Sequence, residues 1–129
     1  NESKEKAERA QNIEENFYDL EKAFKVTTGY DFEGYQIVDY KGIVSGDIVL
    51  GTGFISEFAA SWSDAFGTTS NTFAGKMKTA KQKALKQLMA NAMITGANAV
   101  IGIDFDYTMF SNNMLGVSAN GTAVVIRKK

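Results

Sequence analysis

The chain has 129 residues and a formal net charge of −1, from 14 Lys and Arg against 15 Asp and Glu. This length is sufficient for one domain with one substantial core. The near-neutral charge gives no reason to expect nucleic acid or an anionic membrane as a partner. The sequence contains neither cysteine nor histidine, which excludes disulfides, thiolate chemistry and the commonest protein ligands of transition metals. Any metal site would have to use oxygen ligands, which favour hard divalent cations.

Two further features of composition bear on location and on how the chain bends. No apolar run approaches the roughly 20 residues needed to cross a bilayer, and no secretory leader is visible. We therefore expect a cytoplasmic protein without a membrane partner. Proline is absent while glycine numbers 12, so glycine and asparagine must make the turns.

Residues 3 to about 25 are predicted to form an amphipathic helix, with Ser3 as its N-cap. Apolar residues recur on one face of this segment at helical spacing: Ala10, Ile13, Phe17, Leu20 and Phe24. We treat residues 1–25 as an N-terminal extension and residues 26–129 as an α+β domain. The apolar stripe must be buried somewhere. We expect it to dock on the domain's own sheet or on a neighbouring subunit; the alternative is a tether to something upstream.

Residues 35–51 alternate in polarity and predict a long strand or a strand pair. Gly42 and Gly46 interrupt this alternation. Glycine inside a strand usually marks a bulge, a bend or the close approach of another backbone.

Residues 54–66 are predicted to form a short helix ended by Gly67. Its aromatic residues stand at strict i, i+4 steps: Phe54, Phe58, Trp62 and Phe66. Such a ridge is too aromatic for a solvent-facing surface, so it belongs to the core or to a subunit interface. Together with the sheet edges that need cover, it predicts a homo-oligomer.

A second, longer helix is predicted to begin near Asn71 or Thr72 and to run to about Thr95, with Gly96 as its stop. Its outer face carries five lysines: Lys76, Lys78, Lys81, Lys83 and Lys86. A lysine face on a helix is usually solvated, and anion binding is the alternative.

Two strands, residues 98–110 and 114–126, are joined by an asparagine-rich turn at residues 111–113. In the first strand we place Ala99, Ile101, Ile103 and Phe105 on one face and Asp104 and Asp106 on the other. The order of elements predicts an α+β fold of two layers, in which a long helix packs on a curved, largely antiparallel sheet.

Asp104 and Asp106 leave the same face of their strand and are the candidate metal ligands, for a hard cation such as Ca²⁺ or Mg²⁺. Asp47 or Asp64 could complete the set. The alternative is that the two acids lie at the rim and accept hydrogen bonds from backbone amides or contact a lysine of a neighbouring subunit. We predict no catalytic residues, because the chain lacks an activated nucleophile and its usual base partner. We therefore expect that it is not an enzyme.

Several separated blocks, residues 42–51, 96–107 and 117–124, resemble the YbjQ-like family of small bacterial proteins, which are labelled as heavy-metal-binding and have no known function. The resemblance covers residues from about 35 to 125, and the N-terminal helix lies outside the usual family core. It implies a subunit similar to those of dodecin-like folds and assembly into a pentameric ring. The function expected on this basis is a ring-forming oligomer that binds a metal ion or small ligand at subunit junctions. The alternative is a purely structural or adaptor module without a ligand.

Overall fold

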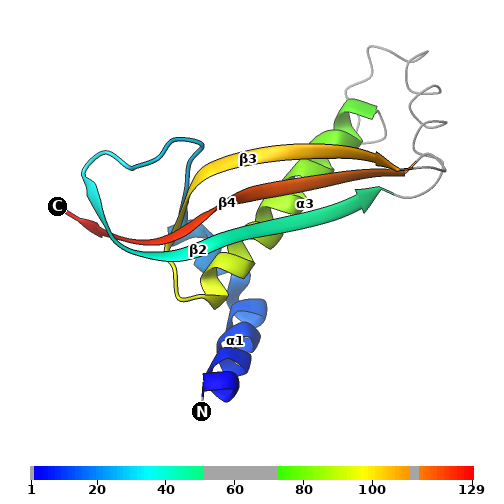
Figure 1. The fold of residues 1–129 in the computed structure, drawn as a ribbon. Helices are drawn as coiled ribbons and strands as arrows, with labels where there is room; N and C mark the ends of the chain where they lie inside the picture. The colour runs from blue at the N-terminus through cyan, green and yellow to red at the C-terminus, as the bar shows by residue number, and fades with distance from the viewer. Residues whose placement is uncertain (1, 51–72, 111–113) are drawn as a thin grey trace.

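A computed structural model describes residues 2–50, 73–110 and 114–129. Its elements in chain order are α1 (Glu2–Ala23), β1 (Lys25–Val26), β2 (Tyr35–Leu50), α3 (Phe73–Ile94), β3 (Ala99–Phe110) and β4 (Met114–Lys128) (Figure 1). The predicted helix of residues 54–66, with the aromatic ridge Phe54, Phe58, Trp62 and Phe66, lies outside the described residues. Asp64 and the predicted turn at residues 111–113 also lie outside them.

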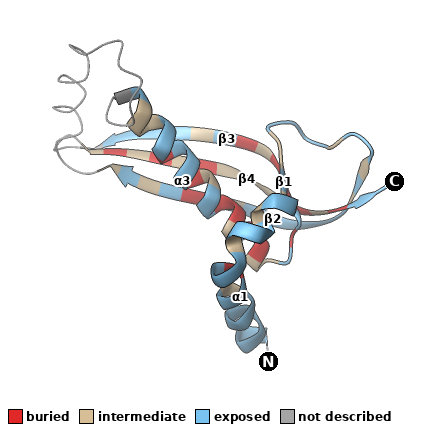
Figure 2. Ribbon diagram, turned by 180° about the vertical axis from the view of Figure 1, so that it is seen from behind, coloured by how far each residue is buried: buried red, intermediate tan, exposed pale blue. Residues whose placement is uncertain are grey.

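The strands form one mixed sheet in the order β1-β3-β4-β2. β1 runs parallel to β3, whereas β3 with β4 and β4 with β2 are antiparallel. The long helix α3 crosses one face of this curved sheet (Figure 2). The predicted α+β class, with a largely antiparallel sheet packed by one long helix, is confirmed. No helix in the described ranges is long and apolar enough to cross a membrane.

The main core lies between α3 and the sheet. The helix contributes a stripe of mostly small residues at helical spacing: Ala80, Ala84, Leu88 and Ala92, all buried. They pack against Val117, Ala119 and Ala123 of β4. Burying Leu88 and Val117 completely stabilises the fold by about 1.5–3 kcal/mol each. The alanines let the helix lie close to the strands, which fixes where α3 crosses the sheet.

The end of α3 follows the sequence prediction. Gly96 has a φ of +93°, in the left-handed region that favours glycine. Its N–H donates to the carbonyl of Met93 at 2.9 Å, and the N–H of Ala97 donates to the carbonyl of Ala92 at 3.3 Å. These bonds satisfy carbonyls of the last helical turn, as at other glycine-terminated helices. The predicted stop at Gly96 is confirmed.

The predicted alternation along β3 is wrong beyond Ile101. The register with β4 shifts between Ile101 and Asp104, and Gly102 has a φ of +64°. Ala99 and Ile101 therefore pack in a second cluster with Val124 and Ile126 of β4. Ile103 and Phe105 instead belong to the core beneath α3. A bulge adds one residue to the strand, and because the side-chain period is two, that residue exchanges the faces.

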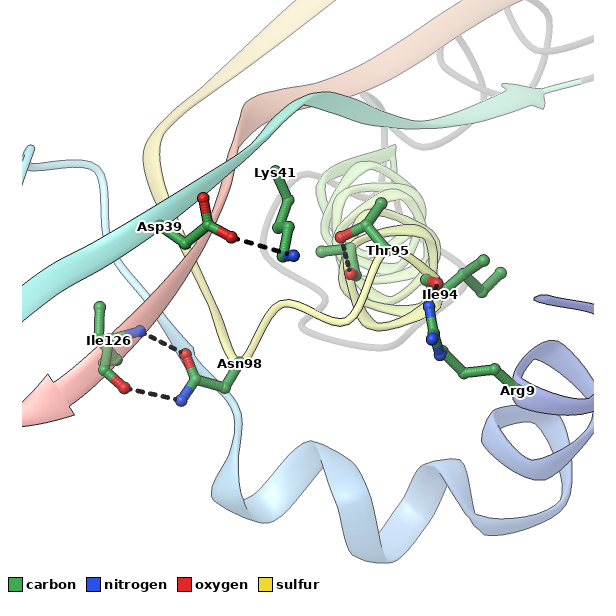
Figure 3. A network of polar contacts seen from close by, with 8 residues as sticks. Arg9, Asp39, Lys41, Ile94, Thr95, Asn98 and Ile126 are labelled. Atoms are coloured by element: carbon green, nitrogen blue, oxygen red, sulfur yellow. Dashed lines mark hydrogen bonds and ion pairs between the residues drawn. The ribbon is translucent and has the colours of Figure 1, made fainter. Parts of the chain in front are cut away.

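Helix α1 packs on α3 of its own chain. Ile13 is buried against Met89 and Met93. Nη1 of Arg9 donates a hydrogen bond of 2.7 Å to the carbonyl of Ile94, at the end of α3 (Figure 3). The expected docking within the chain is thus correct, but the surface is a helix and not the sheet. Met89 and Met93 bury the apolar stripe of α1. Arg9 satisfies a backbone carbonyl at the end of α3 that has no partner within the helix.

Candidate functional site

The face of the sheet opposite α3 carries a row of polar side chains from three strands. Asp104 and Asp106 of β3 lie opposite Asn120 and Ser118 of β4, respectively. Asp47 of β2 lies opposite Ser118 from the other side. All three carboxylates are exposed to solvent. The structure therefore brings Asp47, one of the two acids expected to complete the site, onto the same face as the predicted pair.

Hydrogen bonds across the strands hold two of these carboxylates. Oγ of Ser118 donates to Oδ1 of Asp47 at 2.5 Å. Nδ2 of Asn120 donates to Oδ2 of Asp106 at 3.0 Å. Hydrogen bonds to a charged acceptor are among the stronger ones. The partners are side chains of β4, and the expected backbone amides are not among them.

The carboxylates do not converge on one point. Asp106 and Asp47 are separated by the intervening strand β4, which places their strands about 10 Å apart, at roughly 4.8 Å per strand. Within the ranges that the structure covers, no three His, Cys, Asp or Glu side chains form a group that could hold a metal ion. Asp47 therefore does not complete a site with Asp104 and Asp106. The pair itself stays a prediction for a hard cation.

A heavy metal does not fit this donor set. Soft and borderline metals select thiolate and imidazole ligands, and the sequence contains no cysteine and no histidine. The exposed acids offer only oxygen atoms, and a selective oxygen site normally takes six to eight of them for Ca²⁺.

Asn98 has a structural role that the sequence did not reveal. Its Nδ2 donates to the carbonyl of Ile126 at 2.9 Å, and its Oδ1 accepts from the N–H of Ile126 at 2.7 Å (Figure 3). The side-chain amide thus binds one residue of β4 as a neighbouring strand would. A possible signal was the asparagine between a helix stop and a strand, where side-chain amides often bond to the backbone.

Two further amides on α3 seal part of the outer edge of β2. Oε1 of Gln87 accepts from the N–H of Asp47 at 3.0 Å. Nδ2 of Asn91 donates to the carbonyl of Ser45 at 2.7 Å. Because the two amides stand four residues apart on one helix face, they reach successive outward groups of the strand. Exposed strand edges favour pairing with other chains, and this pair blocks one edge at Ser45 and Asp47.

Among residues 2–50, 73–110 and 114–129, the outer edge of β3 is covered only at its beginning. There β1 pairs with Ala99 and Val100, and the N–H of Ile103 donates to the carbonyl of Thr27 at 3.1 Å. Beyond that point β3 has no strand partner on this side among the described residues. Its last part also exposes two large apolar side chains, Tyr107 at 47% and Met109 at 58%.

Comparisons with known proteins agree on one family. A YbjQ family model described as "Putative heavy-metal-binding" matches residues 24–127. A UPF0145 protein of Clostridium botulinum is 46% identical over 101 residues, which cover 77% of this chain and 95% of that protein. A UPF0145 protein of Acetivibrio thermocellus is 43% identical over 103 residues, which cover 78% and 97%.

The chain is also similar to a solved structure, that of a protein of unknown function from the DUF74 family of Pediococcus pentosaceus. The TM-score is 0.45 at 21% identity, and the match covers 81% of this chain and 98% of that one.

Proposed function

Since the chain belongs to the YbjQ-like family, we propose that it is a non-catalytic, ring-forming homo-oligomer, a pentamer, that binds a small ligand where its subunits meet. The observation that carries this proposal is the outer edge of β3 beyond Ile103, which no other strand in the described part of the chain covers. An edge of this kind carries unpaired N–H and C=O groups, which pair readily with a strand of another chain.

The two outer edges of the sheet differ, and this favours a ring. One edge is the end of β3, with Tyr107 and Met109 exposed. The other is β2, where Gln87 and Asn91 block the backbone at Ser45 and Asp47 in the second half of the strand, and a partner would pair with the first half. Contact between two different surfaces of identical subunits is head-to-tail, and it closes into a ring when the rotation allows.

Exposed apolar side chains on β2 support the same assembly. Tyr40 is 65% exposed and Ile43 is 86% exposed. Single apolar residues on a surface are ordinary, but several on the two outer strands of one sheet mark an interaction surface. Subunit contact would remove them from water.

The polar row on the open face supports a ligand at the junction. Asp104 and Asp106 belong to the strand whose edge would meet the next subunit, and they offer oxygen acceptors there. Ser118 and Asn120 already orient two of the carboxylates in the row. In the proposed ring this row lies beside the contact, where a second subunit would enclose a ligand. The absence of cysteine and histidine from the sequence supports binding over catalysis.

Light scattering tests the assembly. A pentamer of this 14.1 kDa chain would have five times that mass, about 70 kDa. Tyr107→Lys and Met109→Lys should each lower the mass toward that of the monomer, because a charge would be buried at the contact. Tyr18→Lys, at a tyrosine that is 76% exposed on α1, is the matched control and should keep the mass. A monomeric parent at micromolar concentration would overturn the proposal.

Native mass spectrometry of protein purified from cells separates a ligand-binding ring from a structural module. The proposal expects a mass excess over five chains that disappears after denaturation and refolding. A ring that carries no excess mass would support the structural or adaptor alternative. The test needs no prior choice of ligand.

A further inference from the structure

We propose that the groove between α1 and α3 binds a single-chain amphiphilic anion, such as a fatty acid. The groove has a volume of about 590 Å³, within the range usual for small-molecule sites. It lies inside one chain and does not depend on the subunit junction. Its two features, an apolar trough and a cationic rim, match the two parts of such a ligand.

The trough is built from apolar side chains of three elements. Ile13 and Phe17 of α1 form one wall, Ala90 and Ile94 of α3 form the other, and Ile48 of β2 also lines it. Ile13 is held in place by its burial against Met89 and Met93. Water in such a trough finds few hydrogen-bond partners, so an alkyl chain that displaces it is favoured.

The shape of the trough is set by the helix axis. The α3 residues that line it run from Lys83 to Ile94, and these eleven residue steps correspond to about 16 Å at 1.5 Å per residue. An extended alkyl chain therefore fits along the helix better than a compact ring system does. The hydrogen bond from Arg9 to the carbonyl of Ile94 holds α1 against α3 at the end away from the lysines.

The rim supplies positive charge at the other end. Lys83 and Lys86 both line the groove and are exposed. Neither forms an ion pair within the residues that the structure describes. Lysine can lay its alkyl stem along an apolar surface while its ammonium group stays in water. Glu14 is the one acid among the lining residues, which leaves the groove with a net charge of +1.

The wall that α1 provides distinguishes this chain from the two relatives described above. The family match begins at residue 24, directly after α1 ends at Ala23. The Clostridium botulinum and Acetivibrio thermocellus proteins are covered over 95% and 97% of their lengths. Little of either relative remains to form a helix of 22 residues like α1. The groove is thus a site that the added helix creates.

Calorimetry with dodecanoate, dodecanol and acetate tests the proposal, at concentrations below micelle formation. We expect saturable binding of dodecanoate, weaker binding of dodecanol and none of acetate. Added salt should lower the affinity for dodecanoate and leave the affinity for dodecanol unchanged, because salt screens only the charged headgroup. No binding of dodecanoate, or equal binding of dodecanoate and dodecanol at low salt, would overturn the proposal.

Substitutions locate the site. The double variant Lys83→Gln/Lys86→Gln should raise the Kd of dodecanoate about five- to tenfold, as expected for two exposed charge contacts, and leave dodecanol unchanged. The control Lys6→Gln/Lys78→Gln removes the same charge from residues outside the groove and should leave both affinities unchanged. Glu14→Gln should lower the Kd of dodecanoate about two- to threefold, because it removes the negative charge from the groove. Equal effects of the two lysine pairs would refute the assignment.

Ala90→Phe fills the trough and should abolish binding of both alkyl ligands, with an unchanged circular dichroism spectrum as evidence of folding. Amide chemical shifts in the parent protein provide a readout without substitution: dodecanoate should move signals of Phe17 and Ala90 and leave those of Asp104 and Asp106 in place. A second copy of the chain is the other possible occupant. If Ala90→Phe lowers the mass in solution while the parent binds no dodecanoate, the groove is a protein interface and the proposal fails.

Discussion

Gly46 of β2 lies so close beneath Ala84 of α3 that a Cβ atom on the glycine would overlap the carbonyl oxygen of the alanine. Gly46 is itself buried. The helix therefore comes close to the sheet at a point where the strand has no side chain. The side-chain amides of Gln87 and Asn91 reach the backbone of β2 because the helix lies close to the strand at Gly46.

We predict that Gly46→Ala lowers the free energy of unfolding by about 1–3 kcal/mol, since the added methyl group must push backbone and not a flexible side chain. Urea denaturation at a fixed protein concentration measures it. Gly29→Ala is the matched control, because its Cβ would meet only Thr27 Oγ1 at 3.5 Å. Equal losses in the two variants would show that close packing at Gly46 is unimportant.

Gln87→Ala and Asn91→Ala should each lower the free energy of unfolding by about 1 kcal/mol, the usual net value of one hydrogen bond. The double variant should also aggregate faster, because the β2 edge at residues 45–47 becomes available to other chains. Denaturation and thioflavin fluorescence measure the two effects. Gln82→Ala, on the exposed face of the same helix, should change neither. A stable, non-aggregating double variant would contradict the blocking role.

Asn98→Ala should lower the free energy of unfolding by about 1–2 kcal/mol, because the N–H and the carbonyl of Ile126 both lose a hydrogen-bond partner in a half-buried setting. Asn98→Asp should cost more at neutral pH, since a carboxylate oxygen would then face the carbonyl of Ile126 in place of a donor. Thermal unfolding of the two variants gives the order. If Asn98→Asp is as stable as the parent protein, the amide has no bridging role.

Zn²⁺ and Cd²⁺ should leave the melting temperature unchanged, since the chain offers neither thiolate nor imidazole. The carboxylate pair predicts a different response to Ca²⁺ or Mg²⁺, a saturable stabilisation of about 1.4 kcal/mol at ten times the Kd. Asp104→Asn/Asp106→Asn should abolish that response, whereas Asp31→Asn, at an exposed acid of the loop before β2, should preserve it. A parent protein that is indifferent to millimolar Ca²⁺ and Mg²⁺ would remove the pair as a cation site.

Local patterns in the sequence were sufficient for the α+β class and for the ends of several elements. Gly96 predicted the end of α3 because a helix often ends at a residue in the left-handed conformation, and glycine adopts that conformation whatever its distant contacts. Gly42 and Gly46 were expected to mark a bulge or a close approach, and each shows one of the two. The register of β2 shifts between Tyr40 and Gly42, whereas Gly46 admits the helix.

The remaining features depend on contacts between distant residues. In the sequence, Gln87 and Asn91 look like ordinary polar residues on a solvated helix face. Their partners on β2 lie 40 and 46 residues away in the sequence. The surface that receives α1 could not be read from its apolar stripe, because a stripe records that a face is buried and not what buries it. The sequence identified Asp47, Asp104 and Asp106 as candidates, but the separation of Asp47 from the other two by β4 follows only from the strand order.

At Gly102, the side chains of β3 exchange the two faces of the sheet. Before it, Ala99 and Ile101 pack with Val124 and Ile126; after it, the residues that continue the same spacing, Ile103 and Phe105, pack in the core under α3. Any L-amino acid at this achiral position would be strained by a φ of +64° and would crowd the ring of Tyr30 at 3.3 Å. The exchange of faces along β3 therefore depends on one backbone conformation, and the residues before and after position 102 keep their separate packing partners for as long as that position has no side chain.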